Sequence, residues 1–223
     1  MSQKIALAVV IPTLNAARTL PATLAALGPV SEVIVSDGGS SDATRQIAID
    51  AGARVIAAPA GRGSQIAAGI GAAEQPWLLI LHADTCLRDG WQTDVSAHMV
   101  ENPAKAGYFR FAVRSADPRA RRLERMVAWR CRVLALPYGD QGLLIHRDLL
   151  CAVGGMGDLP LMEDVDLIRR LGRRRLVALD AVALTSAEKW HRDGWYRRSA
   201  RNLGCLLLWF AGLPPRWIVR LYG

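Results

Sequence analysis

The sequence predicts an α/β fold with a mostly parallel, twisted central sheet flanked by helices. Two observations favour it: short apolar runs recur through the first half of the chain, and they alternate with stretches whose leucines or isoleucines fall at helical spacing. Continuous apolar runs suit strands buried on both faces, which occur mainly in parallel sheets covered by helices. Strands that alternate with helical crossovers indicate the same architecture.

Taken in order, the expected strands lie at 5–11, 32–36, 53–58, 77–81, 106–113 and 142–146. The first four, with their crossovers, form the parallel part of the sheet, and the pattern changes after Pro103. Helices are expected where apolar residues recur every three or four positions: around Leu20, Leu24 and Leu27, around Ile66, Ile70 and Ala73, along the basic segment 119–135, and from 193 to 210.

Composition limits the class of protein. A chain of 223 residues forms one domain, 1–223, with a substantial core. The apolar stretch Cys205–Leu213 is much shorter than the roughly 20 residues that a membrane-spanning helix needs, and the first residues lack the shape of a secretory signal. The widely spaced cysteines indicate neither a disulfide framework nor a zinc site. We therefore expect a cytoplasmic protein, either free or peripheral at the inner membrane face.

The chain is basic, with 28 Lys+Arg against 20 Asp+Glu and a net charge of +8. Nucleic acid, anionic lipid and a phosphorylated small molecule would each be attracted by this charge. For the arginine-rich run at 114–132, a solvated helix face is the alternative. Trp77 and Trp209 lie in apolar runs that predict burial, whereas a nucleic-acid-binding module needs exposed stacking aromatics. We therefore expect no nucleic-acid partner.

Polar motifs follow the first two strands. In "IPTLN", Pro12 is expected to end strand pairing and Asn15 to cap the next helix. In "SDGGSSD", Asp37 stands at the strand tip, where it either contacts a ligand or forms an Asx turn. Ser41 or Asp42 can cap the helix that follows. Because the carboxyl ends of parallel strands meet at one edge of the sheet, these motifs mark the expected ligand site.

Two further motifs suit a phosphate and a cation. "GRGSQ" places Arg62 before a helix N-terminus, a favourable position for phosphate oxygens. It is not a dinucleotide fingerprint, because Ile66 stands where the third glycine would be. "LHADT" places His82 and Asp84 after the strand at 77–81. A divalent cation that bridges phosphate oxygens needs only one or two protein carboxylates, so Asp84 is sufficient to anchor it.

The last motif, "LPLMEDVDL", puts Glu163 and Asp164 side by side at the start of an expected helix, with Asp166 shortly after. An acidic first turn that complements the helix dipole is one interpretation. A general base is the other, because a carboxylate in a cleft can accept the proton of an attacking hydroxyl.

In this order, "IPTLN", "SDGGSSD", "GRGSQ", "LHADT", "GDQGLLIHRD" and "PLMEDVDL" resemble the family 2 glycosyltransferases with the GT-A fold, over nearly the whole chain. The short chain and "GDQG" look closest to a small bacterial subgroup, the arsenosugar-biosynthesis or radical-SAM-associated glycosyltransferases. The resemblance implies a nucleotide-diphospho-sugar donor, an unknown hydroxyl acceptor, Mn²⁺ or Mg²⁺, and inversion at the anomeric carbon. It also implies a nucleotide-sugar-binding half at 1–102, an acceptor and catalytic half at 103–192, and a C-terminal helical segment at 193–223.

The resemblance also implies roles for individual residues. Asp164 would be the general base, and Asp84 with His82 would hold the metal. His82 and Gly38 depart from the family, which usually has Asp at both positions, and His82 could equally be a strand-end residue with a satisfied hydrogen bond. The donor would contact Pro12, Thr13, Asn15, Asp37, Gly38, Gly61, Arg62, Gln65 and Ala83, and the acceptor Gly107, Asp140, Gln141 and Glu163.

Two alternatives are weaker. A nucleotidyltransferase usually carries a glycine-rich basic loop after the first strand, which "IPTLN" lacks; a basic nucleic-acid-binding protein is the other. The C-terminal stripe of Leu203, Leu206, Leu207 and Phe210 either packs on the catalytic domain, which we favour, or docks on anionic lipid. We therefore expect at most weak peripheral membrane association.

Overall fold

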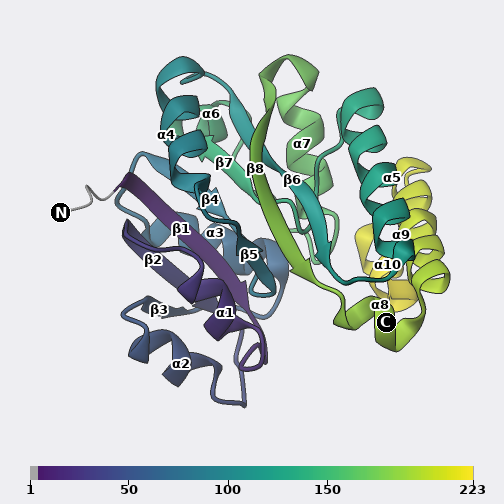
Figure 1. Ribbon diagram of the computed structural model, residues 1–223, viewed down its shortest axis with the longest axis horizontal. Helices are drawn as coiled ribbons and strands as arrows, with labels where there is room; N and C mark the ends of the chain where they lie inside the picture. The colour runs from purple at the N-terminus through teal and green to yellow at the C-terminus, as the bar shows by residue number, and fades with distance from the viewer. Residues whose placement is uncertain (1–4, 223) are drawn as a thin grey trace.

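The computed structural model describes residues 5–222 and shows one curved sheet covered by helices (Figure 1). The sheet has eight strands in the order β3-β2-β1-β4-β7-β6-β8-β5. The strands are β1 (Ile5–Thr13), β2 (Val30–Asp37), β3 (Arg54–Ala57), β4 (Trp77–Ile80), β5 (Thr85–Leu87), β6 (Ala106–Arg114), β7 (Leu143–His146) and β8 (Leu176–Ser186).

The predicted parallel half is confirmed, because β3, β2, β1 and β4 all pair in parallel. The other half is mixed: β7 is antiparallel to both β4 and β6, β8 is parallel to β6, and β5 is antiparallel to β8. The sequence reading missed β5, which is very short, and β8. Along β8 buried residues alternate with less buried ones, but the less buried Val182 and Leu184 are apolar too, so the sequence of this strand shows no clear period-two pattern.

Helices connect and cover the strands. They are α1 (Leu20–Ala25), α2 (Thr44–Asp50), α3 (Arg62–Ala72), α4 (Trp91–Glu101), α5 (Pro118–Leu134), α6 (Arg147–Ala152), α7 (Glu163–Leu171), α8 (Glu188–Asp193), α9 (Trp195–Phe210) and α10 (Pro215–Tyr222), with a 3₁₀ turn at Arg173–Arg175. The helices expected near 20–27, 66–73, 119–135 and 193–210 are therefore present; α4, α6, α8 and α10 were not anticipated.

The core lies on both faces of the sheet. Alternate residues of β1 point to opposite sides: Leu7, Val9 and Ile11 join one buried cluster and Ala8 joins another. All four residues of β4 are buried, as the apolar run predicted. A third, smaller cluster includes Trp190 and Trp195 and joins α8 and α9 to the end of β6.

Two local predictions were wrong. Pro12 does not end strand pairing, since β1 and β2 remain in register to Thr13 and Asp37. Pro12 is tolerated because its missing N–H faces the β4 side, where the pairing ends with the bond from Leu81 N to the oxygen of Val10. Asn15 does not cap α1, which begins at Leu20; its side-chain oxygen instead accepts the Ser41 amide at 2.9 Å.

The N-cap of α2 is Ala43, not the predicted Ser41 or Asp42, and it makes no side-chain cap bond. Asp42, one residue earlier, still contacts the helix start, because its carboxylate accepts the amide of Thr44, the first residue of α2, at 3.0 Å. The packing favoured for the C-terminal stripe is wrong for three of its four members. Leu206 is buried, but Leu203, Leu207 and Phe210 are 52%, 60% and 45% exposed. The helix is anchored through a different face, which carries Trp195, Arg198 and Cys205.

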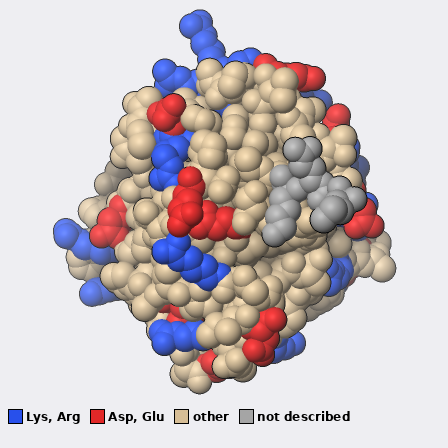
Figure 2. All heavy atoms as spheres, turned by 90° about the vertical axis from the view of Figure 1, so that its left-hand side faces the viewer, with Lys and Arg blue, Asp and Glu red and all other residues tan. Residues whose placement is uncertain are grey.

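Charged side chains of both signs are scattered among neutral residues on the face that lies at the left of Figure 1 (Figure 2). The arginine-rich helix α5 lies at the opposite side of the molecule, next to α9 and α10 (Figure 1). Among residues 5–222, no helix combines the length and the apolar character needed to cross a membrane.

Candidate active site

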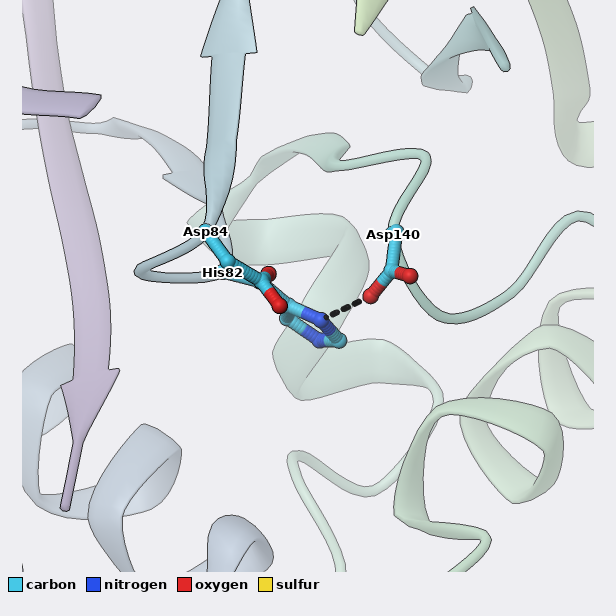
Figure 3. A group of neighbouring side chains, drawn as sticks. All are labelled: His82, Asp84 and Asp140. Atoms are coloured by element: carbon cyan, nitrogen blue, oxygen red, sulfur yellow. Dashed lines mark hydrogen bonds and ion pairs between the residues drawn. The ribbon is translucent and has the colours of Figure 1, made fainter. Parts of the chain in front are cut away.

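The loop after β4 and the loop before β7 bring together two carboxylates and an imidazole (Figure 3). Nδ1 of His82 lies 2.7 Å from Oδ1 of Asp140, and Asp84 completes a group whose ligand atoms all lie within 4.8 Å of one another. All three side chains are mostly buried, with 12%, 13% and 18% exposure for His82, Asp84 and Asp140. The group therefore lies at the carboxyl edge of the parallel strands, where the sequence placed the cation site.

A lysine and an arginine border this group. Nζ of Lys189, in α8, lies 2.6 Å from Oδ2 of Asp84. Burial disfavours the charged lysine, but Asp140 and Asp84 outweigh it and raise the pKa of Lys189. Burial likewise opposes ionisation of Asp140, yet His82, Lys189 and Arg62 hold its pKa below the usual range. Asp140 and Lys189 thus favour each other's charged form at the centre of the site.

The start of α7 places Asp164 beside Asp140. Oδ2 of Asp164 accepts the amide of Gly139, the residue before Asp140, at 2.7 Å. The neighbouring Glu163 has no exposed surface, and Nε of Arg62 lies 3.6 Å from its Oε1. Neither of its oxygens has a hydrogen-bond partner within residues 5–222. Burial, and then the charge of Asp164, raise the pKa of Glu163 from 4.5 to about 7.

The ends of β1 and β2 lie at the same edge of the sheet as the end of β4, because these strands pair in parallel. Nε2 of Gln65, in α3, donates to the backbone oxygens of Thr13 and Ser36 and so joins the two strand ends. A Cβ on Gly38 would lie only 2.9 Å from the same Gln65 nitrogen, so a larger residue there would displace this side chain. The structure brings these predicted donor residues together, but it gives Gln65 a bracing role between strands.

Asp37 is fully buried and accepts several hydrogen bonds. Its donors are the Thr13 and Ser40 hydroxyls, the amides of Gly39 and Ser40, and Nε of Arg45 at 2.6 Å. Burial opposes ionisation, but the bonds from Ser40 and Arg45 lower the pKa of Asp37 to about 2. These contacts are those of a turn-forming residue, which was the alternative interpretation of Asp37. Contact between Asp37 and the nucleobase of the donor stays a prediction.

The remaining predicted residues divide between edge and interior. Pro12 and Gly61 are partly exposed at the edge, Asn15 is exposed, and the oxygen of Ala83 accepts the Thr23 hydroxyl at 3.0 Å. Gly107 and Gln141, predicted to face an acceptor, are buried. The Gln141 amide donates to the oxygen of Phe109 and accepts from Arg130, so it braces the sheet under the site.

Comparison with known proteins decides the family. Residues 8–156, more than half of the chain, match the profile of Glycosyl transferase family 2. The chain belongs to this family. This is the family that the motifs implied, and the nucleotidyltransferase alternative is set aside.

Relatives of this family 2 glycosyltransferase include proteins named uncharacterized glycosyltransferase from Mycobacterium tuberculosis and Mycobacterium bovis. Each is 38% identical over 86 residues, which is 38% of this chain and 39% of the relative. The alignment thus spans about two fifths of the length of these relatives.

Solved structures share the fold. A glucosyl-3-phosphoglycerate synthase from Mycobacterium tuberculosis, in complex with Mn²⁺, UDP and glucosyl-3-phosphoglycerate, is similar at a TM-score of 0.54 and 21% identity, over 81% of this chain and 70% of that one. S. aureus TarS in complex with UDP-GlcNAc is similar at a TM-score of 0.63 and 17% identity, over 82% and 58%. The predicted GT-A fold of the family 2 glycosyltransferase is confirmed.

The described part of the enzyme contains a cavity of about 740 Å³ that begins at the site. Arg62, Asp140, Asp164 and Lys189 line one part of it, and side chains of α5 and α9 line much of the rest. Of the predicted donor residues, only Arg62 borders it. The cavity therefore lies on the side of the site away from the ends of β1 and β2.

The sequence analysis missed Lys189, Arg45 and Arg130, the partners of Asp84, Asp37 and Gln141. Arg45 and Arg130 resemble the many other arginines of the chain, so no local signal singles them out. Lys189 did carry a signal, because it is one of very few lysines in an arginine-rich sequence.

Proposed function

We propose that this enzyme is a metal-dependent, inverting glycosyltransferase that moves a sugar from a nucleoside-diphospho-sugar to a hydroxyl acceptor. The observation that carries the proposal is the group formed by His82, Asp84 and Asp140 beyond the end of β4. Asp164 lies next to this group, because its carboxylate accepts the amide of Gly139, the residue before Asp140. Similar structures bind UDP with Mn²⁺ or UDP with Mg²⁺, which supports this donor class.

The donor atoms of the group fit a divalent cation. Carboxylate oxygens suit both Mg²⁺ and Mn²⁺, and the imidazole favours the softer Mn²⁺. We propose Asp84, His82 and Asp140 as the residues that would hold it; Asp140 thus moves from the acceptor role that the sequence suggested. A bound divalent ion would supply charge stabilisation for the departing diphosphate.

The protein's own residues do the rest. Arg62 and Lys189 border the cluster and can stabilise negative charge that develops on the leaving group. As the acceptor oxygen bonds to the anomeric carbon, the bond from that carbon to the diphosphate oxygen breaks and the acceptor proton passes to Asp164. Attack from the face opposite the leaving group inverts the anomeric configuration.

We propose positioning roles for two buried residues that the resemblance assigned to the acceptor. Glu163 orients Arg62, which lies 3.6 Å away, and Gln141 fixes the loop that carries Asp140 through its bonds to Phe109 and Arg130. Membership of the arsenosugar-associated subgroup and a cytoplasmic location stay proposals that rest on the sequence.

Calorimetric titration with UDP, in MnCl₂ and in EDTA, tests the metal site. We expect Mn²⁺ to tighten UDP binding by at least about tenfold and Asp84→Asn to remove most of that gain, which is about 1.4 kcal/mol. Asp89→Asn is the matched control, since Asp89 is an exposed aspartate a few residues along the chain. Undiminished metal dependence in Asp84→Asn would overturn the assignment.

Inversion is tested without knowing the acceptor. Slow hydrolysis of UDP-glucose, followed by proton NMR, should first release β-glucose, because water replaces the acceptor on the face opposite the diphosphate. Initial release of α-glucose would show retention and contradict the mechanism.

A further inference from the structure

The walls of the cavity beside the site are largely apolar. They include Leu123, Met126 and Trp129 from α5 and Leu203 and Leu206 from α9. Several of these side chains remain substantially exposed: Met126 is 60%, Trp129 53% and Leu203 52% exposed. An enzyme that handled only sugars and phosphates would have no use for such a surface, because exposed apolar area of this extent usually marks a binding site.

The apolar surface continues past the cavity. Val133 on α5 and Leu207, Leu208 and Phe210 on α9 are also at least 36% exposed, and none of them lines the cavity. The same two helices, which lie next to each other (Figure 1), therefore carry exposed apolar side chains outside the cavity as well as along its walls, and the outer ones serve below as the comparison for the lining.

The charges of the lining favour an anion. Among the described residues that line it, Asp140 and Asp164, at the catalytic end, are the acidic ones, and the basic ones are Arg62, Arg122, Arg125, Arg130, Lys189 and Arg198. Arg122 donates to the hydroxyl of Tyr196 at 3.1 Å and Arg125 to the backbone oxygen of Arg121 at 3.3 Å, both neutral groups. These two arginines therefore keep an attractive field for a negatively charged group.

Resting on the proposed function, we propose that the cavity between α5 and α9 is the acceptor site and that the acceptor is an anionic amphiphile. Its hydrocarbon chain lies between Met126, Trp129 and Leu203, its negative group is held by the arginines of α5, and its hydroxyl reaches Asp164. The cavity joins both ends of such a molecule, because Asp164 and Leu203 line the same space.

Dodecyl phosphate, kept below its micelle concentration, is the test probe, and butyl phosphate is the short-chain comparison. Calorimetry should show dodecyl phosphate binding on the order of 100-fold more tightly, since each methylene that leaves water adds affinity. UDP affinity in Mn²⁺ should change by less than about twofold when dodecyl phosphate is present, because the two ligands occupy different parts of the site.

Leu203→Asp should weaken the binding of dodecyl phosphate at least about tenfold, because it places a charge against the hydrocarbon chain of the probe. Leu207→Asp, one turn later on α9 and outside the cavity lining, is the matched control and should stay within about twofold. Met126→Asp repeats the test from the α5 wall. Normal UDP binding by each variant shows that it is folded.

Several results would overturn the proposal. Equal affinity for the two alkyl phosphates would exclude a binding site for the hydrocarbon chain. An equal loss of dodecyl phosphate affinity in Leu203→Asp and Leu207→Asp would indicate nonspecific adsorption. Competition with UDP would place the probe in the donor site. A dimer that Leu203→Asp dissociates, without chain-dependent binding, would make this face a self-association surface. Failure of UDP and Mn²⁺ to bind, with dodecyl phosphate binding as expected, would instead contradict the proposed function alone.

Discussion

Replacing Glu163 with glutamine should stabilise the enzyme in a pH-dependent way. The carboxylate is fully buried, neither oxygen has a hydrogen-bond partner within residues 5–222, and Arg62 approaches only to 3.6 Å. Burial and the neighbouring Asp164 raise its pKa from 4.5 to about 7. The ionised form is therefore less favourable in the folded state than in the unfolded one.

The size of the effect follows from the two pKa values. At about 1.4 kcal/mol per unit, the difference between 4.5 and about 7 corresponds to about 3 kcal/mol. Because the folded state holds its proton more tightly, the free energy of unfolding falls as the pH rises from about 4.5 to about 7. Glu163→Gln removes the ionisable group, so it should be about 3 kcal/mol more stable than the parent at about pH 8 and nearly equal to it at about pH 4.

Urea unfolding of both proteins across this pH range measures the difference directly. Glu101→Gln, at an exposed position at the end of α4, is the control and should stay within about 0.5 kcal/mol of the parent at each pH. A stability difference between Glu163→Gln and the parent that did not change with pH would refute the reasoning.

Three further variants have defined outcomes. Asp164→Asn should keep UDP affinity while turnover falls roughly 100-fold to 10,000-fold, and Asp166→Asn, which affects only the Arg170 pair on the same helix, should retain most activity in the same assay. Asp37→Asn should be less stable than the parent in urea unfolding at neutral pH, and the two should become similar as the pH falls from about 4 to about 2. The reason is that the lowered pKa of Asp37 stabilises the fold only where the carboxylate is ionised. A stability difference that did not change with pH would contradict this. Gly63→Ala should lower the free energy of unfolding by about 1–3 kcal/mol, since its Cβ would lie 2.5 Å from the oxygen of Gly157. Gly71→Ala, with open space around it, should raise the free energy of unfolding by about 0.5–1 kcal/mol. Equal shifts of the melting temperature in the two variants would contradict the packing argument.

The sequence alone determined the parallel half of the fold. An unbroken apolar run such as Trp77–Leu81 is buried on both faces whatever its neighbours are, so its local pattern was enough. It also placed Asp84 after a strand and Asp164 at the start of a helix, because the change from apolar to polar residues marks where a strand ends and an acidic pair marks the first turn of a helix. The antiparallel β5 and the long β8 escaped, since three residues carry little pattern and strand direction depends on distant partners.

Only the tertiary structure decided which residues meet. His82 and Asp140 are 58 positions apart and Asp84 and Lys189 are 105 apart, and these separations are closed by the order of the strands in the sheet. It also decided that Leu203 and Leu207 stay more than half exposed, although their helical spacing is the same as that of a core stripe. Periodicity shows that a helix has an apolar face; whether that face is covered depends on what the rest of the chain packs against it.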